Sequence, residues 1–381
     1  MKVLFCNKLK YPNGDAGSIR VERLAQMAVA LGYDAFVVGL GHEQATAKPG
    51  NGRVPYISLR KQGDTLLHKL LTHILYQKGL RAAICEYKPD VIVMDDIGLL
   101  SALWLKAHCK SRRITLIHDS VEWYSPEQFP HGKLSLRYIS KDILNQYLID
   151  KRCKVIAISR YLFDYYQAKG IQTVRIPIVI TDADLPEPRK DFGRKTVFTY
   201  AGQPGKKDFL HTMLEAFLLI PKGERASAVF NIVGCSGEQM IASGIKKEVL
   251  DELGETLVIH GRVSRDRVLE ILKETDFTLL VRDPEQRYAK AGFPSKVVES
   301  LANATPVLCN YSSDLELYLK DGENAIIAEN HSARAVSEAI RRAIEIPSEG
   351  RYKMSKAAAE SAEQYFDYRR YLGELNDLLK N

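Results

Sequence analysis

Short apolar runs alternate with longer amphipathic stretches along the first half of the chain. Stretches such as 18–32 carry apolar residues at three- and four-residue spacing, which predicts helices. The runs between them are rich in β-branched residues and predict buried strands of a parallel sheet with helices on both faces. These predicted strands are 2–7, 34–40, 90–96, 113–118, 154–159 and 173–179.

The same alternation restarts after an interruption at 181–193. The sequence there, TDADLPEPRKDFG, places two prolines in a polar run and predicts a linker. Beyond it, helical spacing covers 210–220, 244–254 and 265–275, and it returns over the C-terminal 355–380. The apolar runs of this half, which predict a second set of strands, are 196–202, 227–234, 256–261, 277–282 and 306–310.

Two rounds of alternation predict an α/β protein with two doubly wound, Rossmann-like domains facing a central cleft. We expect the first domain over 1–185 and the second over 186–365, with a C-terminal helix over 366–381 that packs back toward the first domain. Ligands of such domains bind at the carboxyl ends of the strands and in clefts. Candidate chemistry is therefore expected directly after the predicted strands.

The composition excludes several protein classes. With 45% hydrophobic residues over 381 positions the chain can bury a large core, yet no run approaches the roughly 18 apolar residues of a membrane-spanning helix. The N-terminal MKVLFCNKLK reads as a strand and not as a signal peptide. The six cysteines lack the spacing of a disulfide framework or a zinc site. We expect a cytoplasmic protein.

Positive charge is concentrated in the first half. Residues 1–190 hold 28 Lys and Arg against 18 Asp and Glu, a net charge of +10, whereas the remainder holds 26 against 29, a net charge of −3. Two basic segments with helical spacing, 60–81 and 131–154, suit anionic lipid headgroups or phosphorylated substrates. A solvated helix face explains either segment alone equally well. Neither a nucleic-acid motif nor an arginine stripe occurs, so we expect no nucleic-acid partner.

One stretch of the second half, KAGFPSKVVESLANATPVL at 290–308, combines a helix start with charged residues. Pro294 suits the first helical position, and the free N–H groups near Ser295 and Lys296 attract an anion that the helix dipole stabilises further. Glu299 follows one turn later, on the face opposite to the apolar residues. This arrangement suits the diphosphate and ribose of a nucleotide, and a solvated Lys–Glu pair is the alternative explanation.

The segment GFPSKVVESLANATPVL resembles the donor-binding signature of the retaining family 4, or group 1, glycosyltransferases, and the order of elements resembles their GT-B fold. In that family the matching glutamate binds the ribose of a nucleotide-sugar, a role that the resemblance assigns to Glu299. The residues that would line the sugar and diphosphate of the donor are Gly292, Phe293, Pro294, Ser295 and Lys296.

Two further segments of the second half resemble the same family. TYAGQPGKKDFLHTMLEAF resembles the strand, glycine turn and lysine that open the second domain. The resemblance places Gly202 in the turn and Lys207 on the diphosphate, with Lys206 in reserve. LVIHGRVSRDRVLEIL resembles the segment whose loop contacts the base. The residues of that loop here are Gly261, Arg262 and Val263.

Two segments of the first half also match. TLIHDSVEWYS matches the position where many members carry a histidine facing the donor sugar, which is His118 in this chain. YPNGDAGSIRVERLAQMAVALGY resembles the glycine loop over the active site, with Gly14 and Gly17 as its glycines. The resemblance therefore brings residues of both predicted domains to one active site.

The sequence departs from the family at several positions. Members often carry a first glutamate eight residues before the ribose-binding one, where this chain has Ala291, which weakens the assignment of the donor sugar. The usual glycine at the end of the helix is Ala304, and we expect Asn303 to take the left-handed conformation instead. Gln203 replaces an arginine after the turn glycine. Arg282 is expected to take its place at the diphosphate, with a loop salt bridge as an equally good explanation.

The charge of a leaving diphosphate decides what the chemistry requires. One donor in a dry site is worth roughly 2.7–4 kcal/mol and a helix start at most ~2 kcal/mol, so a basic side chain or a metal must contribute. Asp182 and Asp184 match the Asp-x-Asp string of metal-dependent transferases but lie in the predicted linker. We expect no metal and no cofactor, with Lys207, Arg282 and the helix start stabilising the charge.

The resemblance implies transfer of a sugar, with retention, from a nucleotide-sugar to a hydroxyl of a glycan or lipid-linked acceptor in surface polysaccharide or glycolipid synthesis. UDP is the common nucleotide among relatives. The leaving phosphate would take the acceptor proton while His118 orients the sugar. The basic first domain would meet an anionic membrane surface at its inner face. An epimerase or phosphorylase on the same fold, and a non-catalytic nucleotide-sugar binder, stay open.

Overall fold

The computed structural model describes residues 1–12, 16–41, 45–47, 54–63, 65–181, 192–193, 195–202 and 207–380. It forms two compact units. Unit 1 comprises Met1–Val179 together with Tyr368–Asn381, and unit 2 comprises Ile180–Asp367. Most of the linker expected at 181–193 lies outside the described residues, as do Asp182 and Asp184.

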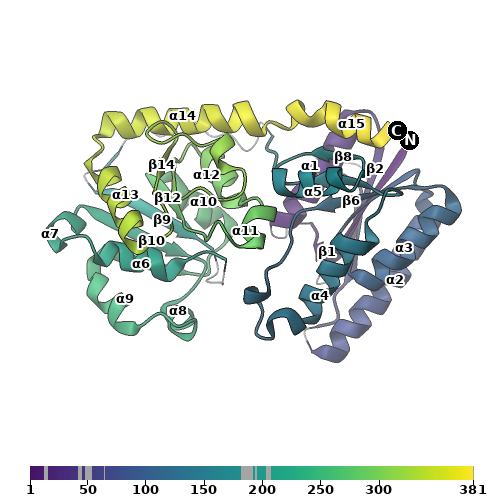
Figure 1. Cartoon of the computed structure of the whole chain (residues 1–381), viewed down its shortest axis with the longest axis horizontal. Helices are drawn as coiled ribbons and strands as arrows, with labels where there is room; N and C mark the ends of the chain where they lie inside the picture. The colour runs from purple at the N-terminus through teal and green to yellow at the C-terminus, as the bar shows by residue number, and fades with distance from the viewer. Residues whose placement is uncertain are drawn as a thin grey trace. The chain divides into compact units, whose positions relative to one another are not determined.

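Unit 1 is built on an eight-stranded sheet with helices on both faces (Figure 1). The strand order is β3-β4-β2-β1-β5-β6-β7-β8, and all neighbours are parallel except β3 and β4. Because β1 lies between β2 and β5, the direction of winding reverses between β1 and β5, which makes their carboxyl ends a switch point where ligands bind. The strands are β1 (Lys2–Lys10), β2 (Asp34–Gly41), β3 (Ala45–Ala47), β4 (Tyr56–Arg60), β5 (Val91–Asp95), β6 (Thr115–Ser120), β7 (Lys154–Ala157) and β8 (Thr173–Arg175).

The helices of unit 1 include one from the far end of the chain. Leu375, Leu378 and Leu379 of this last helix are buried in the same core as α1, and Lys154 Nζ donates to the Leu378 carbonyl at 2.7 Å. The helix predicted within 131–154 is broken into α4 and a π-helical turn, Leu144–Leu148. The helices are α1 (Ala16–Ala30), α2 (Leu66–Tyr87), α3 (Leu99–Arg112), α4 (Leu136–Ile143), α5 (Arg160–Ala168) and α15 (Leu372–Lys380), with short 3-10 turns at Pro126–Gln128, Gly132–Leu134 and Tyr368–Tyr371.

A buried ion pair fixes α1 against the carboxyl edge of this sheet. Arg20 Nη2 and Nε lie 2.7 and 2.8 Å from the two carboxylate oxygens of Asp119 in β6. The same guanidinium donates to the carbonyls of Ile176 and Pro177, just beyond β8, at 3.0 and 2.7 Å. Because both charges are paired and hydrogen-bonded, they are tolerated in the core, and they hold the N-terminal part of α1 at this edge.

Unit 2 repeats the plan with six parallel strands in the order β11-β10-β9-β12-β13-β14. Its first strand, β9, lies between β10 and β12, so a second switch point forms where β9 and β12 end. Together the two units confirm the predicted fold class of two doubly wound parallel α/β domains. The strands are β9 (Thr196–Ala201), β10 (Ala228–Val233), β11 (Leu257–Gly261), β12 (Phe277–Leu280), β13 (Val307–Cys309) and β14 (Ala325–Ile327).

Helices cover both faces of the second sheet (Figure 1). Phe198, Phe217, Phe230 and Phe277 form the centre of the core, with Phe217 and Phe230 stacked at 4.7 Å between ring centroids. The helices are α6 (Leu210–Leu218), α7 (Lys222–Arg225), α8 (Gly237–Ala242), α9 (Lys247–Leu253), α10 (Arg265–Lys273), α11 (Arg287–Ala291), α12 (Ser295–Ala302), α13 (Ala333–Glu345) and α14 (Ser348–Phe366), with 3-10 turns at Gly254–Thr256 and Leu315–Leu317.

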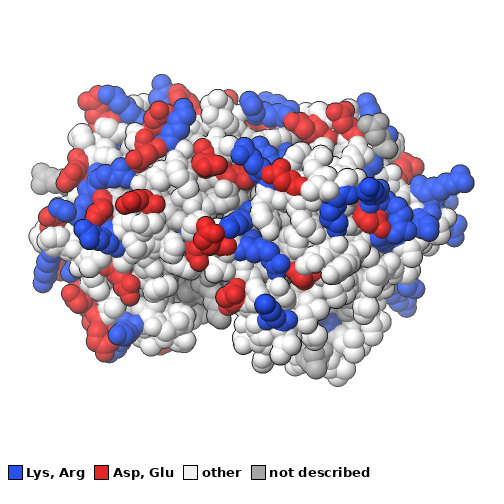
Figure 2. Space-filling model, in the orientation of Figure 1, with Lys and Arg blue, Asp and Glu red and all other residues white. Residues whose placement is uncertain are grey.

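The surface charge differs between the units (Figure 2). Acidic and basic residues are interspersed over unit 2, whereas lysine and arginine gather over the end of α3 in unit 1. The lower end of unit 1 in this view, over α4 and the start of α2, is largely uncharged. Within the described residues, each helix is either too short or too polar to cross a bilayer.

Candidate active site

The candidate ligand-binding edge of unit 2 lies at the switch point, where β9 and β12 end. Tyr200 is near the end of β9 and Gly202 directly follows that strand, while Arg282 follows β12. A Cβ atom at Gly202 would collide with the ammonium group of Lys296. Glycine at this position therefore lets Lys296 of α12 approach the end of β9.

Asp208, which precedes α6, joins the cationic side chains at this edge. Arg282 Nε donates to Asp208 Oδ1 at 2.8 Å, and Lys296 Nζ pairs with Oδ2 of the same carboxylate. The Tyr200 hydroxyl donates to Oδ2 at 3.1 Å, and Lys296 Nζ lies 4.5 Å from the centre of the Tyr200 ring. One carboxylate thus holds two cations at the carboxyl edge of the sheet.

The electrostatics of this cluster favour its charged form. Asp208 is 7% exposed, and although burial alone would favour its protonated form, Arg282 and Lys296 outweigh burial and hold its pKa well below the usual range. Burial lowers the pKa of Lys296, and Asp208 opposes that shift. The side chains of Arg282 and Lys296 are 12% and 28% exposed, so both retain a path to a ligand.

Backbone contacts fix the position of each member. The N–H of Phe209 donates to the Val281 carbonyl at 2.9 Å, which attaches the segment carrying Asp208 to the end of β12. The Asn310 side chain, just after β13, accepts from the N–H of Arg282 at 3.0 Å and donates to its carbonyl at 2.8 Å. The cluster is therefore built on the ends of three adjacent elements and not on one loop.

The start of α12 lies beside this cluster. The sequence predicts Pro294 as the first helical residue, but the structure has Pro294 as the N-cap with φ −75° and ψ 105°, and Ser295 begins the helix. The N–H groups of Ser295 and Lys296 therefore precede the first helical hydrogen bond and can face an anion. The Phe293 ring is buried against Tyr318, with 5.6 Å between ring centroids, so only the backbone of Phe293 can line a ligand.

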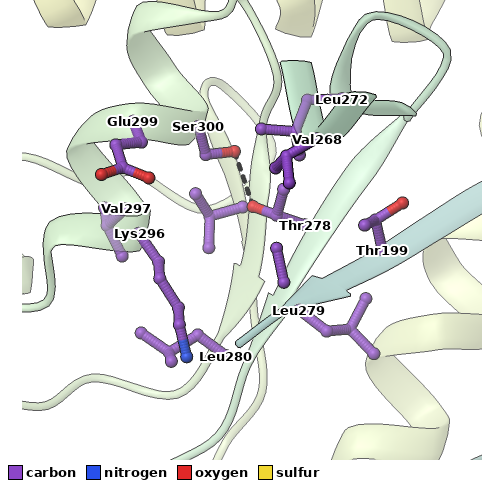
Figure 3. Close-up of a pocket in the computed structure, with 12 residues that line it drawn as sticks. Thr199, Val268, Leu272, Thr278, Leu279, Leu280, Lys296, Val297, Glu299 and Ser300 are labelled. Atoms are coloured by element: carbon purple, nitrogen blue, oxygen red, sulfur yellow. Dashed lines mark hydrogen bonds between the residues drawn. The ribbon is translucent and has the colours of Figure 1, made fainter. Parts of the chain in front are cut away.

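Glu299 lies one turn after Lys296 on α12 and is half-buried. Figure 3 shows Lys296 reaching toward the end of β12 near Leu280, with Glu299 higher on the same helix. Beneath them is a cavity of ≈ 30 Å³, where the hydroxyls of Thr278 and Ser300 are hydrogen-bonded at 2.6 Å. This volume suits one or two water molecules, so a nucleotide must bind at the outer edge and not inside the helix–sheet layer.

The end of α12 differs from the sequence-based expectation. Asn303 has a φ of −89°, and Ala304 takes the left-handed conformation with a φ of +54°. The N–H of Ala304 donates to the Leu301 carbonyl and that of Thr305 to the Ser300 carbonyl, both at 2.9 Å. The turn thus closes the helix without glycine, at a cost of roughly 1–2 kcal/mol for the alanine.

The other predicted donor-binding residues of unit 2 lie around the same carboxyl edge. Gly261 ends β11 with a φ of +66°, a conformation that favours glycine, and the loop continues through exposed Arg262 and half-buried Val263. Lys207 is half-buried, next to Asp208 in the chain. Lys206 lies outside the described residues, and so does Gln203.

In unit 1, His118 lies in β6 and is fully buried. Burial and the charge of Lys141 lower the pKa of His118 to about 3, so its ring is neutral. On the neighbouring β5, burial and the charge of Asp119 raise the pKa of Asp95 to about 8. Within the described part of the chain, Oδ1 of Asp95 and Nδ2 of Asn7 are buried without a hydrogen-bond partner. Such orphaned groups are typical of a site that holds water or a polar ligand.

A second polar group lies at the switch point of unit 1. Lys8 Nζ contacts His73 Nδ1 of α2, and a Cβ atom at Gly98 would lie 3.2 Å from that ammonium group. Burial lowers the pKa of Lys8 to about 8, and Asp96 opposes that shift. Asp96, directly after β5, has a φ of +40°, and strained residues of this kind concentrate at functional sites. These residues can hold the polar part of a second substrate.

The structure brings together only part of the predicted site. Gly202, Lys296 and Arg282 meet at one edge of unit 2, where Ser295 and Glu299 are carried by the same helix as Lys296. His118 and Gly17 belong to unit 1. Gly17 lies in the first turn of α1, and Gly14 is outside the described residues.

Sequence reasoning missed Asp208, although it directly follows Lys206 and Lys207 and precedes a helix. An acid next to two lysines was the available signal for an ion pair. Lys8 was also not assigned, although it follows the predicted strand 2–7. Asp95 and Asp96 end the predicted strand 90–96, a position that the sequence places toward an acceptor or solvent. All three positions satisfy the rule that ligands bind at the carboxyl ends of strands.

Comparisons with known proteins identify a related sequence family and related folds. The sequence model of the family Glycosyl transferases group 1 matches residues 182–361. Sucrose-phosphate synthase from Thermosynechococcus elongatus is 16% identical, with a TM-score of 0.77 over 99% of this chain and 98% of that one. Anabaena HepE in complex with UDP and glucose is 16% identical, with a TM-score of 0.70 over 100% and 99%.

WaaG, a glycosyltransferase involved in lipopolysaccharide biosynthesis, is 15% identical, with a TM-score of 0.70 over the full length of both chains. At these identities the solved structures establish the fold, which is that of the GT-B glycosyltransferases. No curated protein matches the sequence significantly. The family match covers nearly all of unit 2, including Asp208, Arg282 and α12. Residues 182–361 of the chain are therefore similar to the group 1 glycosyltransferases.

Proposed function

We propose that this protein transfers a sugar, with retention of the anomeric configuration, from a UDP-sugar to a hydroxyl of a glycan or lipid-linked acceptor. The pathway we propose is surface polysaccharide or glycolipid synthesis on the cytoplasmic side of a membrane. The observation that carries the proposal is the convergence of Arg282 and Lys296 beside the start of α12.

The donor diphosphate would bind Arg282, Lys296 and the free N–H groups of Ser295 and Lys296. One such donor in a dry site is worth roughly 2.7–4 kcal/mol in the transition state, and a helix start adds up to ~2 kcal/mol. Lys207 is adjacent to Asp208 in the chain, so Lys207, Arg282 and Lys296 together carry three positive charges against the one negative charge of Asp208. The net charge of +2 matches the two negative charges of a leaving diphosphate. Side chains can thus supply the stabilisation, and we propose transfer without a metal or cofactor.

Glu299 would accept hydrogen bonds from the ribose, and the loop of Gly261, Arg262 and Val263 would contact the base. UDP is favoured because HepE, which shares the fold, was solved with UDP and glucose. In the retaining step the leaving phosphate takes the proton of the acceptor hydroxyl on the same face of the sugar. Since its ring is fully buried, we give His118 no step in this reaction, and its contact with the donor sugar stays a prediction.

The acceptor would meet the carboxyl edge of unit 1. Lys8 and Asp96 lie at the switch point there, with His73 of α2 beside them. A lipid-linked acceptor is favoured by the basic character of this half of the chain and by its fold, which is also that of WaaG. An anionic membrane surface is accordingly the proposed partner of unit 1.

The direct test offers the protein a panel of nucleotide-sugars and measures the nucleoside diphosphate released, with and without lipid-linked acceptors. We expect acceptor-dependent release, unaffected by EDTA, with retention visible in the NMR spectrum of the product. Arg282→Gln should abolish it, and Lys290→Gln, in the exposed pair with Glu285, should not. Conversion without acceptor would indicate an epimerase, and a requirement for inorganic phosphate would indicate a phosphorylase. Nucleotide binding without turnover would indicate a non-catalytic binder.

A further inference from the structure

The outward face of α2 is apolar over its first three turns. Its inward face is formed by Thr72, Tyr76 and Leu80, which are buried against the sheet. On the opposite side Leu67 and Leu70 are 64% and 57% exposed, and Leu71, Ile74 and Leu75 are exposed as well. A surface helix normally turns polar residues outward. The start of α2 is therefore apolar on both sides, and its outer side has no cover from the described part of the chain.

Neighbouring elements extend this apolar surface. Leu100 and Leu103 of α3 are exposed, as are Leu134 in the 3-10 turn before α4 and Leu136 at the start of α4. The guanidinium of Arg81 in α2 lies 4.6 Å from the centre of the Trp104 ring in α3, so these helices lie side by side. Both flank the parallel strand β5, so both start at the carboxyl edge of the sheet. We define the exposed apolar face as these four leucines together with the five residues of α2.

Nine of the nineteen large hydrophobic side chains that are exposed in the described part of the chain belong to this face. Contiguous apolar patches of this kind on a protein surface mark interaction sites. Basic residues predominate in the segments that carry the face. The segments 65–81, 99–113 and 130–141 contain lysine and arginine but neither aspartate nor glutamate. Figure 2 shows the corresponding end of unit 1 as mostly white, with scattered blue residues.

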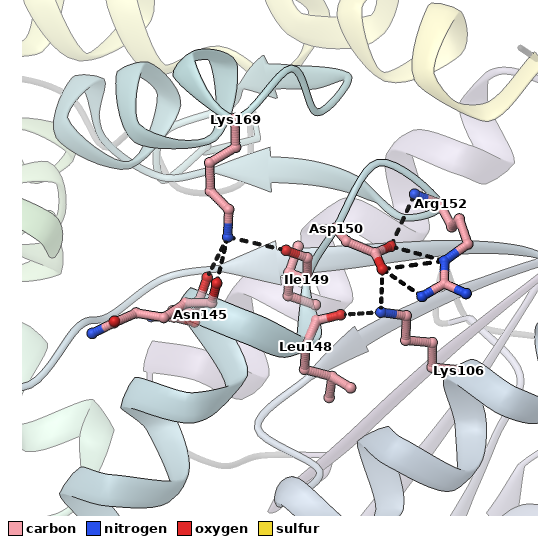
Figure 4. A network of polar contacts seen from close by, with 8 residues as sticks. Lys106, Asn145, Leu148, Ile149, Asp150, Arg152 and Lys169 are labelled. Carbon is pink, nitrogen blue, oxygen red and sulfur yellow. Dashed lines mark hydrogen bonds and ion pairs between the residues drawn. The ribbon is translucent and has the colours of Figure 1, made fainter.

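The part of the face near α4 is firmly attached to unit 1. Lys169 Nζ donates to the carbonyls of Gln146 and Ile149 at 2.7 and 3.3 Å, at the end of the π-helical turn (Figure 4). Lys106 Nζ donates to the Leu148 carbonyl and pairs with Asp150 at 2.8 Å. These contacts satisfy carbonyls that a helix end leaves without partners. The contacts anchor the turn that continues α4, the helix that carries Leu136.

We propose that the exposed apolar face inserts into the headgroup layer of an anionic membrane, with the surrounding lysines and arginines on lipid phosphates. Apolar residues flanked by basic ones are the pattern of interfacial membrane binding. A second copy of the chain fits less well, because a symmetric dimer through this face would bring its basic residues against one another. A role for this face in bringing the enzyme to a lipid-linked acceptor rests on the proposed function. The face and the edge proposed for the acceptor are connected because His73 of α2 contacts Lys8 at that edge.

Vesicle flotation of the full chain tests the proposal, with phosphatidylcholine vesicles that contain or lack phosphatidylglycerol. Leu70→Ser combined with Ile74→Ser should reduce binding to the anionic vesicles roughly tenfold or more, since both side chains would leave the headgroup layer. Lys69→Gln and Lys78→Gln should each reduce it about fivefold. The matched control is Leu219→Ser with Ile241→Ser, two exposed apolar residues of unit 2, which should bind as the wild type does.

Unchanged melting temperatures would show that the variants are folded, which is expected because every replaced side chain is exposed. The proposal is overturned if the wild type ignores anionic vesicles, if the α2 and unit 2 variants bind equally, or if the α2 variant loses self-association and the wild type lacks lipid binding. Flotation needs neither donor nor acceptor. Vesicle binding without sugar transfer would therefore refute only the proposed function. Sugar transfer without vesicle binding would refute only the proposed role of this face.

Discussion

Replacing Asp208 with asparagine would remove one charge from the candidate donor site while keeping the shape of the side chain. Asp208 is buried and pairs with Arg282 at 2.8 Å and with Lys296, and it accepts from the Tyr200 hydroxyl at 3.1 Å. Asparagine can accept one of these hydrogen bonds but cannot balance two cations. Both Arg282 and Lys296 would be left partly buried without the carboxylate that pairs with them.

The expected loss of stability follows from this geometry. Removing one partner of a buried pair costs about 3–5 kcal/mol. Lys296 is 28% exposed and can turn toward water, so we take the lower end, about 3 kcal/mol. For a domain of this size the melting temperature changes by about 2–4 °C per kcal/mol, which gives a fall of roughly 6–12 °C for Asp208→Asn.

The pH dependence has a definite sign. Because the pKa of Asp208 is held below its usual value, its contribution to stability is present above the unfolded pKa of about 4 and is lost as the pH falls further. The gap in melting temperature between wild type and Asp208→Asn should therefore be constant near neutral pH. It should narrow on acidification below about pH 4.

Ligand binding gives the second half of this test. Adding UDP should raise the melting temperature of Asp208→Asn more than that of the wild type, because the diphosphate meets two cations that no carboxylate occupies. Glu285→Gln is the matched control, since it removes a carboxylate from an exposed ion pair of the same unit and should cost at most about 1 kcal/mol. The reasoning is refuted if Asp208→Asn has the same melting temperature as the control variant, or if UDP raises the melting temperature of Asp208→Asn less than that of the wild type.

Three further predictions concern single side chains. Glu299→Ala should weaken UDP binding about thirtyfold or more by calorimetry, because charged hydrogen bonds to the ribose are lost. A large fall in melting temperature with intact binding would return Glu299 to a structural role. Lys207→Ala should lower the turnover number about a hundredfold while UDP binding changes little, and an unaltered rate would remove Lys207 from the diphosphate. Since burial raises the pKa of Asp95 to about 8, its charge destabilises the fold increasingly as the pH rises to that value. Asp95→Asn should therefore melt higher than the wild type near pH 8, with little difference near pH 4, and equal melting curves at both would contradict the burial of that charge.

The fold was predictable because buried parallel strands leave continuous apolar runs, and such runs occur at β1, β5 and β9. The strand β4 was missed because its sequence, YISLR, is short and is followed by basic and polar residues. The break within 131–154 was missed for a different reason. A π-helical turn keeps nearly the same spacing of apolar residues, and the contacts that stabilise it come from Lys106 and Lys169 in other elements.

The candidate site was predictable where its position follows from a strand end or helix start, as for Arg282 and Lys296. Their shared contact with Asp208 was not predictable from the sequence, because this contact depends on which strands are neighbours in the sheet. Asp208 lies 74 residues from Arg282 and 88 from Lys296 in the chain. Only the placement of β9 beside β12 brings these residues within 3 Å or so of one another, and no local pattern records that order.

The exposed apolar face of α2 shows a further limit of what periodicity can reveal. A periodic pattern reveals a helix by the contrast between its two sides, and the first turns of α2 lack that contrast because Leu70 and Ile74 oppose Tyr76 and Leu80. Hydrophobicity alone cannot distinguish a side that meets the sheet from one that meets lipid. Charge can distinguish the two sides, because a protein core excludes lysine whereas a headgroup layer attracts it. The absence of acidic residues from 65–81 is therefore the feature of the sequence that favours the proposed contact with lipid over burial in a core.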